Sequence, residues 1–332
     1  MSSLGTTQRK TWPRPVRKSR CAATPKGDRI LLLQFLATRR KFLQTSTVAA
    51  AGGAFALAAD AAILEPNHPK VVQVEVPLAR LPEAWDGLRV VQLSDFHYDE
   101  HFSVTPLRRA IDMVNRLHPD LVVLTGDFVT VPLLAHSLQN QKRVADAAEP
   151  CALLLSRLYA RFGTLAILGN HDADSDPNRI IDILHAQNIS VLRNRSIPLE
   201  QGGKRLWLAG VDDVLVGRPD LDLALRQIPQ NETVILLVHE PDFADTVARR
   251  PVDLQLSGHS HGGQVRFPLI GAPYLPPLAR KYPWGLRRIG PLTLYTNAGI
   301  GTIRVPVRFN CPPEITLITL RAAAGGGTKP AP

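Results

Sequence analysis

Cysteine is scarce in this chain of 332 residues and occurs only at positions 21, 151 and 311. Three cysteines without the paired spacing of a zinc finger exclude a disulfide framework and a thiolate zinc site. Cys151 opens an apolar run, where it is expected to be a small buried hydrophobe. A disulfide between Cys151 and Cys311 is conceivable, but no feature of the sequence supports it.

Long apolar runs are equally rare. Only 47–64, a stretch rich in Ala and Gly, approaches the roughly 18 residues needed to span a bilayer. It follows 38–44, where Arg39 and Arg40 precede a Phe-Leu step, and this order resembles a twin-arginine export signal. Candidate A-x-A cleavage sites lie at 56–58 and 59–61. A short membrane anchor and a chance pair of arginines are the alternatives.

Acidic residues are nearly absent from the leader. Residues 1–41 contain eleven Lys and Arg but a single acid, Asp28, which leaves 28 of the 39 basic and 28 of the 29 acidic residues for the rest of the chain. The formal net charge of +10 therefore belongs to the leader, and the remainder is neutral. Net charge gives no reason to expect a specific nucleic-acid partner.

What the chain does contain, after the leader, is an alternation of apolar strands and amphipathic helices, which predicts an α/β domain. Beyond residue 262 frequent prolines break regular helix, leaving loops and short strands. We expect strands at 71–76, 88–93, 121–124, 164–168, 205–209, 233–238, 253–256, 292–295 and 315–320. We expect helices at 106–117, with Thr105 as N-cap, and at 147–159, 178–187, 220–227 and 242–249. This organisation predicts a leader at 1–61, one domain at 62–321 and a disordered tail at 322–332.

Five polar clusters follow expected strands, and each contains residue types that bind hard or borderline metal ions. One such cluster would carry little information. Five in succession point to a single metal site, because α/β sheets place their sites in the loops at the carboxyl ends of strands. The clusters are Asp95-Phe96-His97, Gly126-Asp127, Gly169-Asn170-His171-Asp172, His239-Glu240-Pro241 and Gly258-His259-Ser260-His261.

In this order the clusters resemble the motifs of the calcineurin-like metallophosphoesterases. The resemblance covers roughly residues 88–265 and depends on three segments in combination, 94–97, 169–172 and 258–264. It implies an α/β sandwich of two mixed β-sheets packed together and flanked by helices. The leader, the block 239–242 and the Gly-Gly-Gln after His261 resemble an exported bacterial phosphodiesterase branch of that family.

The resemblance also implies a dinuclear centre with two divalent metal ions, for which Mn²⁺, Fe and Zn²⁺ are the candidates. Two such ions carry four positive charges, and two carboxylates leave an excess of about two, which suits a phosphate anion and a bridging hydroxide. The ligands implied for the first metal are Asp95, His97 and His261, those for the second are Asn170, His239 and His259, and Asp127 bridges both.

His171 matches the residue that lies near the leaving group in the family. An imidazole with an unperturbed pKa of about 6.5 can protonate a departing alkoxide near neutral pH. The neighbouring Asp172 is expected to orient His171 or to raise its pKa, although a purely electrostatic role for the histidine stays open. Glu240 is a candidate partner for a ligand histidine. Arg304 and Arg308 are either phosphate contacts or ordinary solvated arginines.

The resemblance implies hydrolysis of a phosphoester, more specifically a phosphodiester, by metal-bound hydroxide. The leader implies export through the twin-arginine translocation machinery to the periplasm or the outer face of the cytoplasmic membrane, with membrane association through the leader as a further possibility. One alternative is a pyrophosphatase acting on UDP-2,3-diacylglucosamine in lipid A synthesis, although that substrate is made inside the cell. Another is a metal-stabilised envelope protein without turnover.

Overall fold

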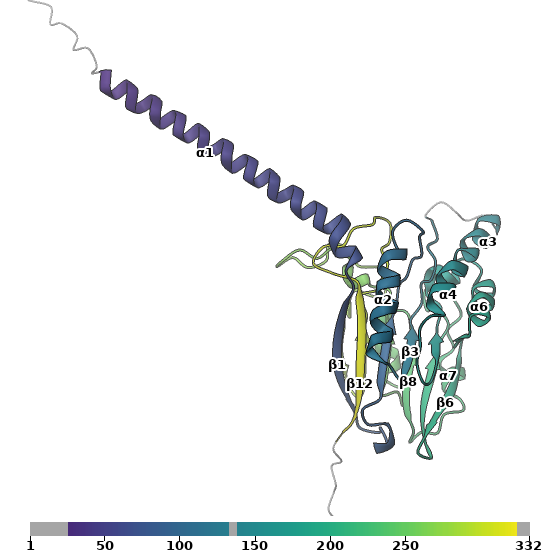
Figure 1. The fold of residues 1–332 in the computed structure, drawn as a ribbon. Coiled ribbons are helices and arrows are strands. Elements are labelled where there is room, and N and C mark those ends of the chain that lie inside the picture. Colours follow the sequence, from purple (N-terminus) through teal and green to yellow (C-terminus); the bar gives the residue numbers. More distant parts are fainter. Residues whose placement is uncertain (1–25, 133–137, 324–332) are drawn as a thin grey trace, which may run out of the picture. The chain divides into compact units, whose positions relative to one another are not determined.

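The computed structural model describes residues 26–132 and 138–323 (Figure 1). The chain divides into two compact units, Met1–Ala56 and Leu57–Pro332. The predicted boundary at 61/62 lies slightly later, and Ala61 is already a buried residue of the second unit. Most of the predicted tail, residues 324–332, lies outside the described residues, while strand β12 continues to Ala322.

Helix α1 (Lys26–Ala59) contains the arginine pair and most of the apolar stretch. It is followed by a π-helical turn, η1 (Asp60–Leu64), and a 3-10 turn, η2 (Glu65–Asn67). Among the described residues, the segment Thr38–Asn67 is long and apolar enough to cross a membrane, with a mean hydropathy of 1.7. Such a helix near the N-terminus is equally typical of a signal sequence, so both interpretations of the leader are compatible with it.

The first sheet has six strands in the order β1-β12-β2-β3-β4-β5. Strand β1 is parallel to β12, β12 is antiparallel to β2, and β2 to β5 are parallel, which makes the sheet mixed. Its central strands are apolar and buried, as parallel strands covered on both faces should be. The bounds are β1 (Lys70–Leu78), β2 (Arg89–Leu93), β3 (Leu121–Leu124), β4 (Thr164–Ala166), β5 (Ile189–Val191) and β12 (Glu314–Ala322).

The second sheet also has six strands, in the order β10-β11-β9-β8-β7-β6. The four central strands are parallel, and the two edge strands, β10 and β6, run antiparallel to their neighbours. The bounds are β6 (Arg195–Gln201), β7 (Lys204–Gly210), β8 (Thr233–Leu237), β9 (Leu254–Ser257), β10 (Gly285–Ile289) and β11 (Leu292–Thr296).

Three clusters of buried apolar side chains hold the layers together. One lies between the first sheet and the helices α2 (Val104–Leu117), α4 (Ala148–Leu155) and α6 (Pro177–Ala186). A second lies between the two sheets, and a third between the second sheet and the short helices α7 (Leu221–Leu225) and α8 (Ala244–Val247). Along β7, Leu206 and Leu208 belong to the cluster between the sheets, whereas Trp207 and Ala209 belong to the outer one, because successive side chains of a strand point to opposite faces.

The helices are α2 (Val104–Leu117), α3 (Leu138–Asp146), α4 (Ala148–Leu155), α5 (Asn170–Ala173), α6 (Pro177–Ala186), α7 (Leu221–Leu225) and α8 (Ala244–Val247). Three further 3-10 turns are η3 (Glu83–Trp85), η4 (Pro241–Phe243) and η5 (His261–Gly263). Figure 1 shows α2, α4 and α6 along one side of the sandwich. The two mixed sheets flanked by helices confirm the predicted fold class.

Several predicted details were wrong. Helix α2 begins at Val104 after Ser103, so Thr105 is inside its first turn and is not the cap. The helices predicted at 147–159 and 242–249 are shorter, ending at Leu155 and Val247. Strands β5, β6 and β10 were not predicted. Cys151 and Cys311 are both buried and free, so the conceivable disulfide is absent.

Candidate metal centre

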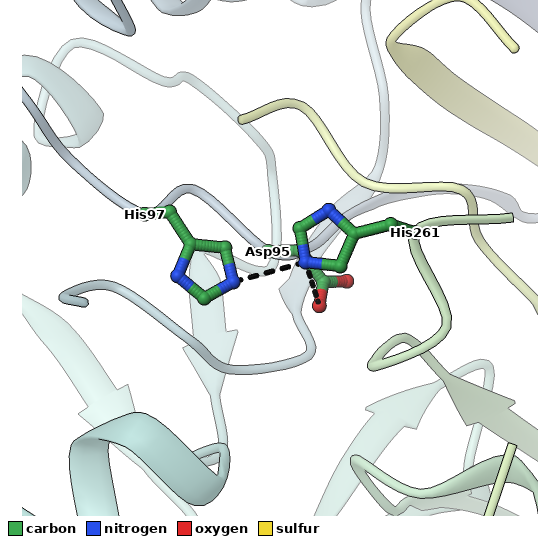
Figure 2. Close-up of side chains that lie close together, drawn as sticks. All are labelled: Asp95, His97 and His261. Atoms are coloured by element: carbon green, nitrogen blue, oxygen red, sulfur yellow. Dashed lines mark hydrogen bonds and ion pairs between the residues drawn. The ribbon is translucent and has the colours of Figure 1, made fainter. Parts of the chain in front are cut away.

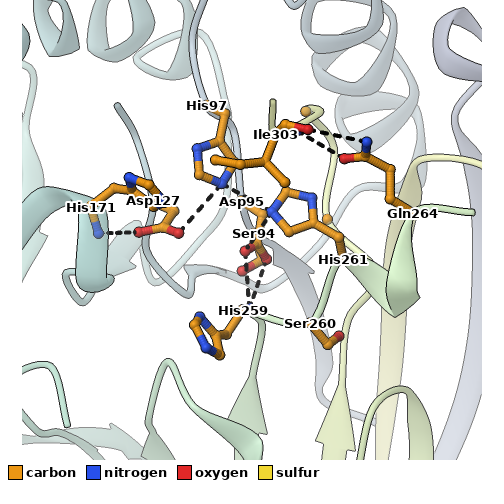
Figure 3. Close-up of polar contacts among 12 residues, drawn as sticks. Ser94, Asp95, His97, Asp127, His171, His259, Ser260, His261, Gln264 and Ile303 are labelled. Carbon is orange, nitrogen blue, oxygen red and sulfur yellow. Dashed lines mark hydrogen bonds and ion pairs between the residues drawn. The ribbon is translucent and has the colours of Figure 1, made fainter. Parts of the chain in front are cut away.

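The predicted site residues come together where the parallel strands of both sheets end. Loops after β2, β3 and β4 of the first sheet and after β9 of the second converge on one place (Figure 3), and the loop after β8 brings His239 to the same place. Asn170 and His171 are half-buried, and the other residues predicted as metal ligands are buried. Those buried residues are Asp95, His97, Asp127, His239, His259 and His261.

The first cluster consists of Asp95, His97 and His261, whose candidate ligand atoms lie within 4.8 Å of one another (Figure 2). The Nε2 atoms of His97 and His261 face each other at 2.9 Å, and Nε2 of His261 lies 3.4 Å from Oδ1 of Asp95. The other ring nitrogen of His97, Nδ1, is 3.0 Å from the Thr130 hydroxyl. Two imidazole nitrogens and a carboxylate oxygen therefore aim at one point, as the ligands of a divalent cation do.

The second cluster consists of Asp127, His239 and His259. Nδ1 of His239 is hydrogen-bonded to the carbonyl oxygen of Thr125 at 2.6 Å, and Nε2 of His259 to that of Pro277 at 2.9 Å. Because a carbonyl accepts, each of these nitrogens carries a proton, so in the neutral ring the lone pair lies on the opposite nitrogen. Such backbone partners fix the tautomer of metal-binding histidines.

Asn170 and His171 lie at the start of α5, directly after β4. Oδ1 of Asn170 is buried and accepts no hydrogen bond within the described residues. A buried acceptor without a partner is costly, so this atom is well placed to meet a cation. His171 forms a third group with His97 and Asp127, again within 4.8 Å. Its backbone N–H donates to Oδ1 of Asp127 at 2.9 Å, which orients that carboxylate.

The backbone is strained at five of the predicted ligands. They have positive φ angles between 41° and 67°, a conformation that costs free energy for residues other than glycine and concentrates at functional sites. These five are Asp95, His97, Asp127, His259 and His261. A neighbouring glycine is also required, because a Cβ on Gly258 would lie 1.9 Å from Oγ of Ser94 and 2.5 Å from Oδ2 of Asp95.

Burial keeps three of the histidines neutral. It lowers the pKa of His97 to about 3 and that of His259 to about 4. The pKa of His261 is well below its usual range because of burial, with His97 and the Arg308 guanidinium acting in the same direction. Neutral imidazoles offer the lone pairs that a metal ion needs.

The two carboxylates of the clusters differ. Burial raises the pKa of Asp95 to about 6. Burial alone would do the same to Asp127, but His239 and His171 hold its pKa well below the usual range. Burial disfavours the charged form of His239, yet the carboxylate of Asp127 outweighs it and raises the pKa of His239 well above the usual range. Asp127 is thus an anion under all ordinary conditions, as a residue shared between cations should be.

The orienting role predicted for Asp172 does not agree with the structure. Its carboxylate is fully buried and accepts hydrogen bonds from four backbone N–H groups at 2.8–3.2 Å, so it fixes the loop after β3 and does not contact the imidazole ring of His171. The donors are the amides of Asp127, Phe128, Val129 and Gly169. The ring of His171 is oriented by the amide of Val131, which donates to Nδ1 at 3.0 Å.

Glu240 also has a different partner from the one expected. Its Oε2 accepts from the amide of Val214 at 3.2 Å. Burial and the neighbouring carboxyl of Asp213 raise the pKa of Glu240 well above its usual range. Glu240 therefore joins the loops after β7 and β8, and it makes no hydrogen bond to the imidazole of His239 within the described residues.

Arg308 is neither a phosphate contact nor solvated. It is fully buried, and its guanidinium donates to four backbone carbonyl groups. Three of these carbonyl groups, from Ala298, Gly299 and Gly301, belong to the loop that contacts the backbone of Asp95, and the fourth is the carbonyl group of Cys311. The loop in turn donates from the amide of Gly301 to the backbone oxygen of Asp95 at 2.8 Å. Sequence reasoning missed this role, because an arginine in an apolar segment gives no sign of its partners.

A pocket of about 710 Å³ lies over both clusters. His171 and five of the candidate ligands line it together with a largely apolar set of side chains from later loops. Those ligands are His97, Asp127, Asn170, His259 and His261. Exposed Arg304 belongs to this wall, with its guanidinium 5.1 Å from the ring centroid of Tyr274. The apolar set includes Val131, Pro132, Val265, Pro277, Ile303 and Val305.

Comparisons with known proteins agree with this geometry. The sequence model of the calcineurin-like phosphoesterase family matches residues 88–263. The metallophosphoesterase YkuE of Bacillus subtilis (strain 168) is 35% identical over 291 residues, which cover 86% of this chain and 98% of YkuE.

Two further relatives extend the comparison. Phosphodiesterase YaeI of Escherichia coli (strain K12) is 31% identical over 70% of this chain and 82% of its own length. A transmembrane protein with a metallophosphoesterase domain from Danio rerio is 35% identical over 77% of this chain but only 58% of its own length. From its motifs, its fold and these relatives, the chain belongs to the calcineurin-like phosphoesterase family.

Proposed function

We propose that this chain is a phosphodiesterase that works with two divalent cations, one in each cluster, bridged by Asp127. The observation that carries the proposal is the position of Oδ2 of Asp127. This one oxygen lies 3.4 Å from Nε2 of His97, in the loop that also carries Asp95, and 3.2 Å from Nε2 of His239 in the second cluster. A carboxylate that faces both ligand sets is what a shared pair of cations requires.

The donor set fits such cations. Asp95 and Asp127 supply the two negative charges, and His97, His259, His261 and the orphaned Oδ1 of Asn170 are neutral donors. When bound, divalent ions at this spacing supply Lewis acidity, acidify a shared water and neutralise charge that develops in an in-line displacement. The mixture of imidazole and carboxylate suits Mn²⁺, Fe or Zn²⁺ without selecting among them.

His171 is the proposed general acid. Because the amide of Val131 occupies Nδ1, Nε2 is the ring nitrogen left to carry the proton that is transferred. The residue lines the pocket beside Asp127, so a proton on that nitrogen is available to the oxygen of a departing alcohol. Protonation avoids expelling an unstable alkoxide, a benefit that depends on the leaving group.

Replacing His171 with Gln is expected to reduce the rate about 10²-fold or more on dialkyl phosphates, whose leaving group needs a proton. The loss should be much smaller on bis(p-nitrophenyl) phosphate, because p-nitrophenolate departs as a stable anion. Steady-state kinetics on both substrates, with His101→Gln as a matched exposed control, measure the difference. An equal loss on both substrates would contradict the acid role and favour a purely electrostatic one.

The diester preference and the location rest on other observations. The relative YaeI is named a phosphodiesterase, and we extend that activity to this chain. The arginine pair before the apolar stretch of α1 supports export by the twin-arginine machinery or retention as an anchor. In either case the catalytic domain at 62–321 would lie on the outer side of the membrane. The pocket would then meet substrates outside the cytoplasm.

Metal analysis combined with a phosphoester panel tests the proposal directly. The purified full-length chain is expected to hold two transition-metal ions and to hydrolyse phosphodiesters faster than monoesters or pyrophosphates. Activity should disappear with a chelator and return with Mn²⁺, Fe²⁺ or Zn²⁺. A protein that binds two metals but cleaves no ester would instead be a metal-stabilised envelope protein.

A further inference from the structure

A tight hairpin beside the pocket exposes apolar side chains that nothing in the described structure covers. Phe267 and Gly271 pair through two backbone hydrogen bonds of 2.9 Å, which brings Leu269 and Ile270 to the tip. Leu269 is fully exposed and Ile270 is 78% exposed. Leu269 also has a φ of 69°, a strained conformation for a branched apolar residue. Strain together with exposed apolar surface suggests a functional role in binding.

The hairpin is continuous with one wall of the pocket. Its first strand pairs with the segment around Phe309, and the rings of Phe267 and Phe309 lie 5.8 Å apart. Gln264, at its base, donates to the backbone oxygens of Ile303 and Val305, which line the pocket. Exposed apolar side chains extend along this rim, and we call them the apolar edge: Phe267, Leu269, Ile270, Tyr274 and Val305.

The segment that carries the apolar edge is basic. Residues 254–313 contain seven Arg and Lys and not one Asp or Glu, and among the seven Arg308 is buried and Lys281 is paired with Asp245. Arg266 stacks on Trp284 with 4.7 Å between its guanidinium carbon and the ring centroid, and Arg304 stacks on Tyr274 in the same way. Exposed aliphatic side chains flanked by Arg, Trp and Tyr are typical of proteins that bind at an anionic lipid interface.

The end of the candidate membrane-spanning segment is fastened to the same loop. The backbone oxygen of Ala61 accepts from the amide of Arg308 at 2.9 Å, and the carboxylate of Glu65 accepts from the amides of Asn310 and Cys311. Phe309, which pairs with the hairpin, lies between these two attachments. One short segment of chain, 303–311, therefore holds both the apolar edge and the residues at the end of the apolar stretch.

We propose that the apolar edge docks on an anionic bilayer, so that the pocket beside it receives a phosphoester that carries an apolar chain. The evidence for docking is the exposed surface of the protein alone, whereas the substrate class rests on the proposed function. The apolar lining of the pocket next to the metal clusters suits a lipid tail, and the clusters suit its phosphate. A bilayer is favoured over a protein partner because exposed apolar side chains lie beside arginines stacked on Trp284 and Tyr274, and because the candidate membrane-spanning segment ends on the same loop.

A fluorescent probe tests docking without any need for turnover. The full-length chain with Cys21→Ser and Ile270→Cys is labelled with an environment-sensitive fluorophore and reconstituted into vesicles of phosphatidylcholine and phosphatidylglycerol. The matched control carries the label at Tyr159→Cys, a position 76% exposed on the same domain. Because both labelled proteins have the same N-terminal leader, any attachment to the membrane through that leader affects the two labels equally. Nitroxide-labelled lipids should quench the probe at 270 roughly threefold more strongly than the probe at 159. Equal quenching at the two positions would overturn the docking.

Kinetics test the substrate class. The double variant Leu269→Asp, Ile270→Asp changes two exposed side chains that do not line the pocket. It should reduce hydrolysis of a phosphodiester amphiphile in anionic vesicles about tenfold while leaving hydrolysis of bis(p-nitrophenyl) phosphate unchanged. Equal losses on both, or no loss on vesicles, would overturn the inference. If the unmodified chain cleaves neither substrate, the proposed function fails, and the quenching measurement still decides the docking.

Discussion

Replacing Asp127 with Asn is expected to lower kcat by about 10³-fold or more, the largest effect of any single substitution in this chain. The change keeps Oδ1, which accepts from the amide of His171, but replaces the oxygen between His97 and His239 with a nitrogen that cannot bind a cation. Metal-ion stabilisation is worth several kcal/mol, and each 1.4 kcal/mol is a factor of ten in rate. Kinetics on bis(p-nitrophenyl) phosphate with elemental analysis of the same sample measure both consequences.

The matched control is Asp112→Asn, which makes the same chemical change on an exposed face of α2. This control should keep full activity and both metals, whereas Asp127→Asn should lose at least one. An Asp127→Asn protein that turns over at the normal rate would remove the basis for a bridged pair of cations, and with it the proposed mechanism.

Replacing Arg308 with Met should destabilise the protein by about 3 kcal/mol or more, because the buried carbonyl groups of Ala298, Gly301 and Cys311 lose their donor and each unsatisfied group costs about 1–3 kcal/mol. The carbonyl of Gly299 keeps the amide of Glu314 as a donor. For a domain of this size that destabilisation corresponds to a fall in Tm of about 6–12 °C, measurable by circular dichroism. Metal affinity should fall as well, since the released loop supports the backbone of Asp95.

Arg304→Met provides the comparison. Arg304 is exposed and contacts a ring at the pocket rim, so its loss should change the free energy of unfolding by no more than about 0.5 kcal/mol. If the two variants melted together at the temperature of the unmodified protein, the buried arginine would not hold the loop as described.

The sequence predicted which side chains would meet because it contains both the strands and the residues that end them. Asp95 and His259 are 164 positions apart, yet the amide of His259 donates to the Asp95 carboxylate, as the ends of the central strands β2 and β9 of the two packed sheets allow. Edge strands were harder to predict. Strand β6 contains Pro198, and β10 is largely polar, so neither has the apolar signature of a central strand.

Backbone partners were invisible at the level of sequence. The carbonyl groups of Thr125 and Pro277 set two imidazole tautomers, and the amide of Val131 sets a third, but any residue type at those positions supplies the same atoms. Asp172 illustrates the converse error. Because Asp172 is next to His171 in sequence, a direct contact was expected, but the carboxylate accepts instead from the amides of the loop after β3.

The left-handed backbone at the metal clusters constrains how this centre can change during evolution. Asp, Asn and His are the non-glycine residues most at ease with positive φ, and they are also ligands for divalent cations. Exchanges among these three types alter the charge and the metal preference of the site at little conformational cost. Glu and Cys bind metals equally well, but at Asp95 or Asp127 they would add backbone strain. Where the bound metal changes during evolution, we therefore expect the ligands at these positions to change only among Asp, Asn and His. The backbone conformation restricts this choice more than coordination chemistry does.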